Sequence, residues 1–275
     1  MYKKILCNGS GNTFFLIHSD DFKTIDIEAE TVRAICDYGQ GSDIDGILII
    51  SLLHKNQYRL DYYNCDGTWE TLCINGSLCA ARYIADNFIK NNQFIFTAGD
   101  GTHKAIINKL GISISMRPPL STKKNISILG HSGSLIDSGA KHFCIIVDKC
   151  TPEIVTEFGP DIRNDDAFHP DGVNVNFIEL IDTNVIKVFT YEKGVEKFMP
   201  SCGSGSVAAL FYVHSYLASD SSQAPQIQSP CSVITPKGEF IITFNDQTNW
   251  TDTYISGPTE ISSVQNIKSL INNIS

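Results

Sequence analysis

Short runs in which apolar and polar residues alternate dominate this chain, and such runs predict β-strands. In the first half, the predicted strands are 14–17, 46–50, 58–63, 94–96 and 112–116. In the second half, they are 143–147, 173–177, 185–190, 233–235 and 239–243. The pattern therefore predicts a chain rich in β-structure, with strands spread over both halves.

Three segments instead carry apolar residues at helical spacing. Residues 78–90 and 204–217 predict one helix in each half, and the amphipathic tail 261–274 predicts a closing helix at the C-terminus. Between the halves, the proline-containing stretch 117–122 predicts a linker.

A shared motif opens both internal helical segments. Residues 73–83 read Cys-Ile-Asn-Gly-Ser-Leu-Cys-Ala-Ala-Arg-Tyr, and residues 202–212 read Cys-Gly-Ser-Gly-Ser-Val-Ala-Ala-Leu-Phe-Tyr. At nearly the same offset, residues 10–20 align with 138–148, and the Asp-Gly of 45–46 aligns with that of 171–172. Three matches at one offset predict a tandem duplication. We expect an N-terminal domain of 1–118, closed by helix 261–275, and a C-terminal domain of 119–260.

Composition narrows the classes of function. A length of 275 residues suits two domains. The net charge of −9 argues against a nucleic-acid partner, and the chain lacks the run of 18 apolar residues that a membrane-spanning helix needs. The N-terminus has no signal-peptide pattern. The nine cysteines are odd in number and form no Cys-x-x-Cys pair, which predicts a reduced, cytoplasmic protein without a metal site.

Two cysteines stand apart because each precedes a predicted helix. The helix N–H groups and the positive end of the helix dipole should lower the pKa of Cys73 and Cys202 below that of an ordinary thiol. The small residues that follow expose N–H groups that can hold a carboxylate. We therefore expect two opposed half-sites, in which one thiolate removes the α-proton of an amino acid and the other thiol returns a proton on the opposite face. The positive helix ends would stabilise the enolate charge.

A structural alternative exists for each motif, namely a helix start with a buried cysteine. Two such motifs in register within a duplicated chain favour catalysis. The remaining cysteines are expected to be small core or surface residues. They are Cys7, Cys36, Cys65, Cys79, Cys144, Cys150 and Cys231.

An ordered set of short motifs runs through the whole chain. They are Gly11-Asn12, Asp45-Gly46, Asn64-Cys65-Asp66-Gly67, Cys73-Ile74-Asn75-Gly76, Gly159-Pro160, Val173-Asn174-Val175, Glu192-Lys193-Gly194 and Cys202-Gly203-Ser204-Gly205. In this order, the motifs resemble those of the diaminopimelate epimerase family of cofactor-independent amino acid racemases and epimerases.

The resemblance implies an α+β fold of two pseudo-symmetric duplicated domains, each a β-barrel-like sheet wrapped around a central helix. It implies an isomerase that needs no cofactor or metal, takes a small amino acid as its partner, and is compatible with a homodimer. Cys73 and Cys202 would be the catalytic bases, and His142 and Glu192 would lie near the thiols and set their protonation. The implied substrate-binding residues are Asn12, Asn64, Ile74, Asn75, Gly76, Asn174, Lys193, Gly203 and Ser204.

Several features depart from the family pattern, including the spacing from Gly194 to Cys202 and Ser204, which stands where the family has a threonine. Ile74 replaces a glycine, Leu78 and Lys193 each replace an arginine, and Ala140 replaces an asparagine. Lysine lacks the two-pronged geometry with which arginine binds a carboxylate, so recognition of a distal carboxylate is altered. The predicted function is conversion of LL- to meso-diaminopimelate in lysine biosynthesis. The alternatives are a racemase of another amino acid such as histidine, with Trp69 and Tyr191 as an aromatic wall, and a non-racemising isomerase-like relative.

Overall fold

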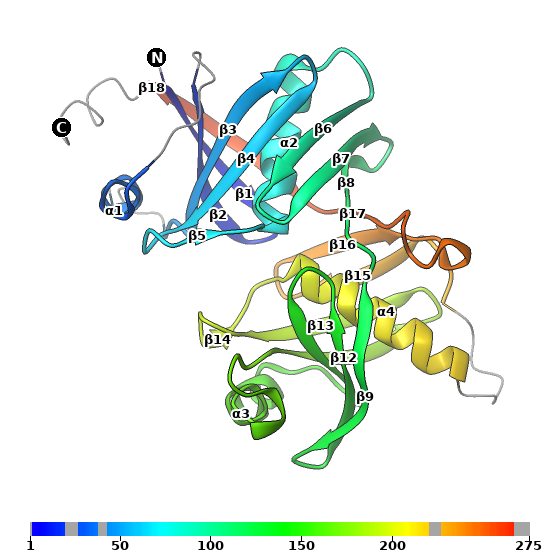
Figure 1. The fold of residues 1–275 in the computed structure, drawn as a ribbon. Coiled ribbons are helices and arrows are strands. Elements are labelled where there is room, and N and C mark those ends of the chain that lie inside the picture. Colours follow the sequence, from blue (N-terminus) through cyan, green and yellow to red (C-terminus); the bar gives the residue numbers. More distant parts are fainter. Residues whose placement is uncertain (1, 20–26, 38–42, 220–226, 267–275) are drawn as a thin grey trace. The chain divides into compact units, whose positions relative to one another are not determined.

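The computed structural model describes residues 2–19, 27–37, 43–219 and 227–266 and separates the chain into two compact units (Figure 1). Unit 1 comprises Met1–Ser115 and Ser256–Ser275, and unit 2 comprises Met116–Ile255. Each unit contains a mixed sheet and two α-helices, so the α+β class is confirmed.

Unit 1 is built on one helix inside a sheet. Its elements are β1 (Tyr2–Gly9), β2 (Asn12–Ser19), α1 (Ala29–Asp37), β3 (Gly46–His54), β4 (Gln57–Asn64), β5 (Trp69–Glu70), α2 (Ile74–Phe88), β6 (Gln93–Ala98), β7 (Gly101–Asn108), β8 (Gly111–Ser115) and β18 (Thr259–Asn266). Strand β18 pairs with β1, β1 with β2, and β3 with β4 in antiparallel fashion, whereas β2–β3 and β4–β6 are parallel. Helix α2 packs against β1, β2, β3, β4, β8 and β18.

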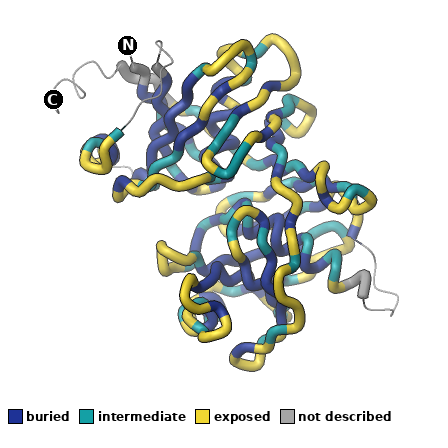
Figure 2. Tube along the Cα trace, viewed as in Figure 1, coloured by how far each residue is buried: buried dark blue, intermediate teal, exposed yellow. Residues whose placement is uncertain are grey.

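The enclosure of α2 follows from its composition. Every residue from Ile74 to Ala81 is buried, including Asn75 and Ser77. A helix with buried residues on all its faces needs neighbours on every side. The strands of unit 1 that pack against α2 supply them, and Figure 2 shows the buried segments of this unit in dark blue.

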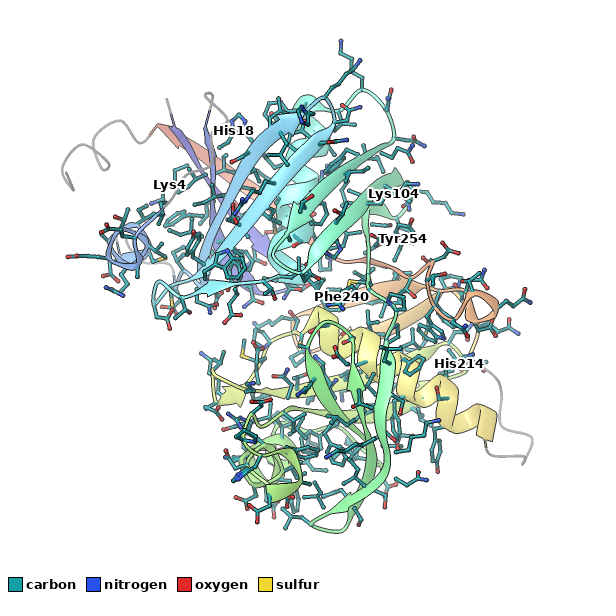
Figure 3. The ribbon with its side chains drawn as sticks, in the orientation of Figure 1. Lys4, His18, Lys104, His214, Phe240 and Tyr254 are labelled. Atoms are coloured by element: carbon teal, nitrogen blue, oxygen red, sulfur yellow. The ribbon has the colours of Figure 1, made fainter. Side chains whose placement is uncertain are left out.

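Unit 2 repeats this arrangement. Its elements are β9 (Leu120–Ile128), β10 (His131–Asp137), β11 (Lys141–Ile146), α3 (Pro152–Arg163), β12 (Asn174–Asp182), β13 (Val185–Glu192), β14 (Lys197–Phe198), α4 (Gly203–Ser219), β15 (Cys231–Thr235) and β16 (Gly238–Thr243), and β17 (Tyr254–Ser256) lies at the boundary in sequence. Strands β11–β12 and β13–β15 are the parallel pairs. Helix α4 packs against β10, β11, β12, β13, β15 and β16. Phe240 of β16, labelled in Figure 3, is fully buried.

Strand register defines which residues are equivalent in the two copies. In unit 1, Gly46 lies between Phe14 and Asn64. In unit 2, His142 pairs with Asn174, and the next residue of β12, Val175, pairs with Tyr191, the neighbour of Glu192. Phe14 is therefore equivalent to His142, and Asn64 is equivalent to Glu192. The Asp-Gly pairs of 45–46 and 171–172, aligned from sequence, lie two residues out of register, because the loop that enters β12 is arranged differently from the one that enters β3.

The C-terminal tail contradicts the predicted closing helix at 261–274. Residues 259–266 form β18, which pairs with β1 so that Cys7 faces Ile261 and Ile5 faces Val264. Without β18, the outer edge of β1 would expose its N–H and C=O groups, and β-branched residues such as Ile261 and Val264 suit a strand. Residues 267–275 lie outside the described part of the chain.

The other predicted elements agree in position, with shifted boundaries. Helices predicted at 78–90 and 204–217 correspond to α2 and α4, although α2 begins four residues earlier. The linker predicted at 117–122 is shorter, because β9 begins at Leu120. Strands β1, β5, β7, β9, β10, β14 and β17 and helices α1 and α3 were not predicted. No helix in the described ranges is long and apolar enough to cross a membrane.

Candidate active site

The first half-site lies at the start of α2 in unit 1. Cys73 is the N-cap residue in an extended conformation, and its carbonyl accepts the first helical hydrogen bond, from Ser77 N–H, at 2.8 Å. Its side chain makes no capping hydrogen bond, and the first turn carries no acidic residue. The first N–H groups of a helix have no acceptor inside the helix and bear partial positive charge. This end of α2 can therefore accept an anionic group.

Two predicted substrate-binding amides meet beside Cys73. Asn75 Nδ2 donates to Asn12 Oδ1 at 2.7 Å, and both residues are buried. Asn64 lies further along the sheet, where its Oδ1 accepts from the Tyr62 hydroxyl at 2.7 Å and its Nδ2 donates to Thr68 at 3.0 Å. Asn12 and Asn75 are thus a rigid pair, whereas Asn64 stabilises the turn between β4 and β5.

Glycines set the close approach of α2 to the sheet. A Cβ added to Gly9 of β1 would lie 2.6 Å from the Asn75 carbonyl oxygen, and one added to Gly76 would lie 2.6 Å from Leu48 Cδ2. Both distances are below van der Waals contact. A side chain at Gly9 would displace the helix turn that follows Cys73, because it would meet backbone, whereas one at Gly76 would require the Leu48 side chain to move.

The second half-site lies at the start of α4 in unit 2. The Gly205 N–H donates to Cys202 Sγ at 3.4 Å, and Ser204 Oγ lies 3.5 Å from the same sulfur. The Cys202 carbonyl accepts from both the N–H and the hydroxyl of Ser206, at 2.9 and 2.8 Å. The sulfur of Cys202 thus lies against the first turn of the helix, as the sequence predicts.

The protonation of Cys202 differs from the expectation. Burial, and next the charge of Glu192, raise the pKa of the Cys202 thiol from 9.0 to about 12. Hydrogen bonds that Ser204 and Gly205 can make to the thiolate form act to lower this pKa but are outweighed. The prediction of a lowered pKa at this position was wrong, because it considered the helix end without the loss of water around the sulfur. Cys202 is therefore a thiol at neutral pH.

His142 reaches Cys202 through Ser204. The ring of His142 is fully buried, with Nε2 3.1 Å from Ser204 Oγ and Nδ1 3.3 Å from Asn176 Oδ1. Burial lowers the pKa of His142 from 6.5 to about 4, although Asn176 and Asp137 act to raise it. His142 is thus a neutral imidazole at pH 7. Sequence reasoning missed Asn176, whose only signal was a polar residue between the apolar Val175 and Phe177.

The remaining predicted residues of unit 2 border this cluster. Asn174 joins two strands, because its Oδ1 accepts from the Lys193 N–H at 2.9 Å and its Nδ2 donates to the Lys141 carbonyl at 3.2 Å. The side chain of Lys193 is exposed, and Gly203 is the first residue of α4. Glu192, Asn174, Gly203 and Ser204 are thus close in unit 2, and Cys73 with its amides belongs to unit 1.

The departures from the family pattern have distinct surroundings. Leu78 is fully buried in α2, in a position where the family pattern has an arginine. Tyr191 belongs to the buried core of unit 2 and packs against Gly159, so the expectation that it forms part of a substrate-binding wall was wrong. Trp69 is 46% exposed and lies against Gly99. Ala140 is in the turn between β10 and β11.

Exposure separates Cys73 and Cys202 from the other cysteines. Both are partly exposed, Cys65 is exposed, and the other six are buried.

His214, labelled in Figure 3, lies about three turns beyond Cys202 on α4 and packs against the rings of Phe244 and Trp250. His142 is therefore the histidine associated with the second half-site.

Comparison with known proteins identifies the family of this chain. The family model of diaminopimelate epimerase matches residues 5–118 and 134–261. The diaminopimelate epimerase of Aquifex aeolicus is 30% identical over 263 residues, covering 90% of this chain and 91% of the relative. That of Hydrogenobaculum sp. is 31% identical over 269 residues, covering 91% and 93%.

Solved structures show the same fold at low identity. A hydroxyproline epimerase from Agrobacterium vitis, with bound trans-4-hydroxy-L-proline, superposes with a TM-score of 0.67 at 12% identity, over 96% of this chain and 90% of that one. The duplicated fold, the family match across nearly all of the chain and the two relatives lead to one conclusion: the chain belongs to the diaminopimelate epimerase family.

Proposed function

We propose that this protein is a cofactor-independent epimerase that converts LL- to meso-diaminopimelate by a two-base mechanism. The observation that carries the proposal is the placement of Cys73 and Cys202 at equivalent points of two duplicated units, each directly before an enclosed helix. Membership of the family supplies the reaction class. Inversion at a carbon requires one group that removes a proton and a second that delivers one to the other face.

The helix ends provide the electrostatic part of the mechanism. The α-carboxylate of the substrate would bind N–H groups of Ile74, Asn75 and Gly76 from α2 and of Gly203 and Ser204 from α4. Removal of the α-proton places negative charge on this carboxylate, which becomes enolate-like. Preorganised N–H donors stabilise that charge most strongly when it is fully developed, so they lower the barrier to proton removal.

The two thiols exchange roles between the two reaction directions. In one direction the Cys73 thiolate takes the α-proton, and the Cys202 thiol gives its proton to the opposite face of the carbanion. In the reverse direction Cys202 is the base. Because the pKa of Cys202 is raised to about 12, its resting form is the donor. Glu192 would set the charge around Cys202, and Asn12, Asn64, Asn174 and Lys193 would orient the rest of the amino acid.

The reducing cytoplasm is the location that we propose, because two catalytic thiols that approach one carbon can oxidise to an inactive disulfide. A homodimer is a further proposal, which sedimentation of the purified protein would test.

The test is inversion in deuterated water with LL-diaminopimelate as substrate. The product should be meso-diaminopimelate that carries deuterium at the inverted carbon, and Cys73→Ala and Cys202→Ala should each abolish inversion. A serine at either position is expected to allow one-sided exchange. Cys65→Ala is the matched control, because Cys65 is the exposed cysteine outside both half-sites. Sustained inversion by either of the two half-site alanine variants would refute the two-base assignment.

A racemase of another amino acid is the second candidate, and the family-pattern departures favour it. Leu78 is buried and apolar, and Lys193 is a point charge rather than a forked cation, so the grip on a distal carboxylate is reduced. A panel of L-amino acids that includes histidine, with chiral analysis of the products, distinguishes the two. Turnover of another amino acid without turnover of diaminopimelate would establish this second candidate. Deuterium exchange without inversion would indicate the isomerase-like alternative.

A further inference from the structure

The two units fill one equivalent position with different chemistry. In unit 1, Leu48 pairs with Tyr62 and packs against Gly76, the third residue after Cys73. In unit 2, Asn176 pairs with Thr190 and packs against Gly205, the third residue after Cys202. The neighbouring equivalent pair is Phe14 in unit 1 and His142 in unit 2. In unit 1, Leu48 and Phe14 fill the positions that Asn176 and His142 occupy in unit 2. Polar side chains at these positions are therefore not required for packing.

The hydrogen bonds of Asn176 fix the orientation of its amide. One amide atom lies 2.8 Å from the Gly205 carbonyl, which can only accept, so this atom is the Nδ2 donor. The other atom is therefore Oδ1, which accepts from the Thr190 hydroxyl at 3.2 Å. The same Oδ1 lies 3.3 Å from His142 Nδ1. Because Oδ1 can only accept, the proton of the neutral imidazole lies on Nδ1.

This tautomer determines the donor and the acceptor in the hydrogen bonds between His142, Ser204 and Cys202. His142 is neutral at pH 7, so its Nε2 has a lone pair and accepts from the Ser204 hydroxyl at 3.1 Å. Ser204 has a single hydroxyl proton, which this bond uses. At the other side, Ser204 Oγ lies 3.5 Å from Cys202 Sγ. There the oxygen can only accept, and the Cys202 S–H is the available donor.

We propose that Asn176 is a positioning residue that fixes the direction of this hydrogen-bond chain, from the Cys202 thiol through Ser204 to His142, and so holds Cys202 as the proton donor. The last clause rests on the proposed function, whereas the direction of the chain does not. When the thiol has given its proton to the substrate carbon, the Ser204 hydroxyl can turn its own proton from His142 Nε2 to the new thiolate. No bond other than hydrogen bonds changes in that rotation, and nothing is oxidised or reduced.

Other ionisable groups lie near the hydrogen-bonded residues Cys202, Ser204 and His142 and affect their pKa values. Glu192 on β13 faces Cys202 and disfavours its thiolate, whereas Cys202 in turn raises the pKa of Cys144 on β11. Asp137 on β10 faces His142 and favours its protonation. A test must therefore separate the hydrogen-bond chain from a simple change in charge.

The first experiment is ¹⁵N NMR of the histidine rings in the intact protein at pH 7. The His142 signals are identified by their loss in His142→Phe, which introduces the residue found at the equivalent position of unit 1. We expect a protonated Nδ1 and an unprotonated Nε2. The opposite tautomer, or a doubly protonated ring at pH 7, would overturn the proposal.

The second experiment reverses the direction of the hydrogen bonds that link Cys202, Ser204 and His142. In Asn176→Asp, a carboxylate beside Nδ1 favours the imidazolium, whose Nε2–H donates to Ser204 and turns the Ser204 proton towards Cys202. The thiolate then gains a charge-assisted hydrogen bond, so alkylation of Cys202 by iodoacetamide at pH 8 should accelerate about tenfold. In the Ser204→Ala background, the same substitution should not accelerate alkylation, because the bridging hydroxyl is gone.

The control variant is assayed in the same way, by measuring alkylation of the peptide that contains Cys202. Ser206→Ala is the matched control, because the Ser206 hydroxyl bonds the Cys202 carbonyl and not its sulfur, so the rate should stay unchanged. Equal acceleration with and without Ser204, or none in either, would overturn the proposal. If Asn176→Asp does not fold, the tautomer measurement on the natural protein decides. Neither readout needs a substrate, so failure of the proposed function leaves both interpretable.

Discussion

Replacement of Glu192 by glutamine should make Cys202 more reactive towards alkylating agents. Burial and the Glu192 charge together raise the pKa of this thiol from 9.0 to about 12, and burial is the larger cause. That difference corresponds to about 4 kcal/mol in favour of the protonated form. At pH 8 an ordinary thiol is about 10% ionised, whereas a pKa of 12 leaves about one thiolate in 10,000 molecules.

Glu192→Gln removes the smaller cause and leaves burial in place. The pKa of Cys202 should therefore fall by less than about 1.5, which limits the gain in thiolate at pH 8 to about thirtyfold. The measurement is the rate of iodoacetamide alkylation of the peptide that contains Cys202, between pH 7 and pH 9. Epimerisation should slow in the direction in which Cys202 is the base, because a more acidic thiol gives a weaker thiolate base.

A control for this prediction is Glu196→Gln in the same hairpin, because Glu196 pairs with Arg163 instead of facing the thiol. Its alkylation rate should match that of the natural protein. If Glu192→Gln leaves the rate unchanged or lowers it, the charge of Glu192 does not raise the pKa of Cys202, and the electrostatic reasoning fails.

Four further predictions concern specificity, stability in acid, stability in alkali, and cofactors. Lys193→Ala should raise the KM for diaminopimelate far more than it lowers kcat, by a factor that corresponds to roughly 1–3 kcal/mol, and an effect confined to kcat in steady-state assays would contradict this. Because the pKa of His142 is lowered to about 4, its contribution of about 3 kcal/mol to the free energy of unfolding is present above pH 6.5 and lost as the pH falls towards 4. The thiols of Cys36, Cys150 and Cys231 have pKa values raised to about 12, so stability should fall from pH 9 upwards by about 1.4 kcal/mol per pH unit for each, and a flat series of urea titrations from pH 9 to 11 would exclude this. Activity should survive EDTA and hydroxylamine but require a reducing agent, and recovery of EDTA-treated enzyme by added metal would argue against it.

The sequence predicted the two helix starts that follow Cys73 and Cys202 because the duplicated cysteine motif is local. Cys73 and Cys202 each directly precede a run of small and apolar residues, and helix starts depend mainly on such local features. The contacts of His142 could not be predicted in the same way. Its partners Asn176 and Ser204 lie 34 and 62 residues further along the chain, and only the parallel pairing of β11 with β12 brings the first of them alongside.

The predictions of a C-terminal helix and of a lowered Cys202 pKa failed for related reasons. Residues 261–266 have apolar positions that fit either a helix or an irregular strand, and the unpaired edge of β1, more than 250 residues away, decides between them. The pKa of Cys202 depends on how much of the sulfur the fold encloses. Pattern and spacing contain no information on either the open edge or the enclosure.

The pairing of β1 with β18 has a consequence for the order in which the protein forms during synthesis. Unit 2 is continuous in sequence, from Met116 to Ile255, whereas the sheet of unit 1 needs strands from both ends of the chain. Domains fold as units while the chain emerges, usually in order from the N-terminus. Here the second unit is complete first, and the N-terminal strand remains without its edge partner until residue 266 has left the ribosome. The half-site of Cys73 therefore matures last, although its residues are made first.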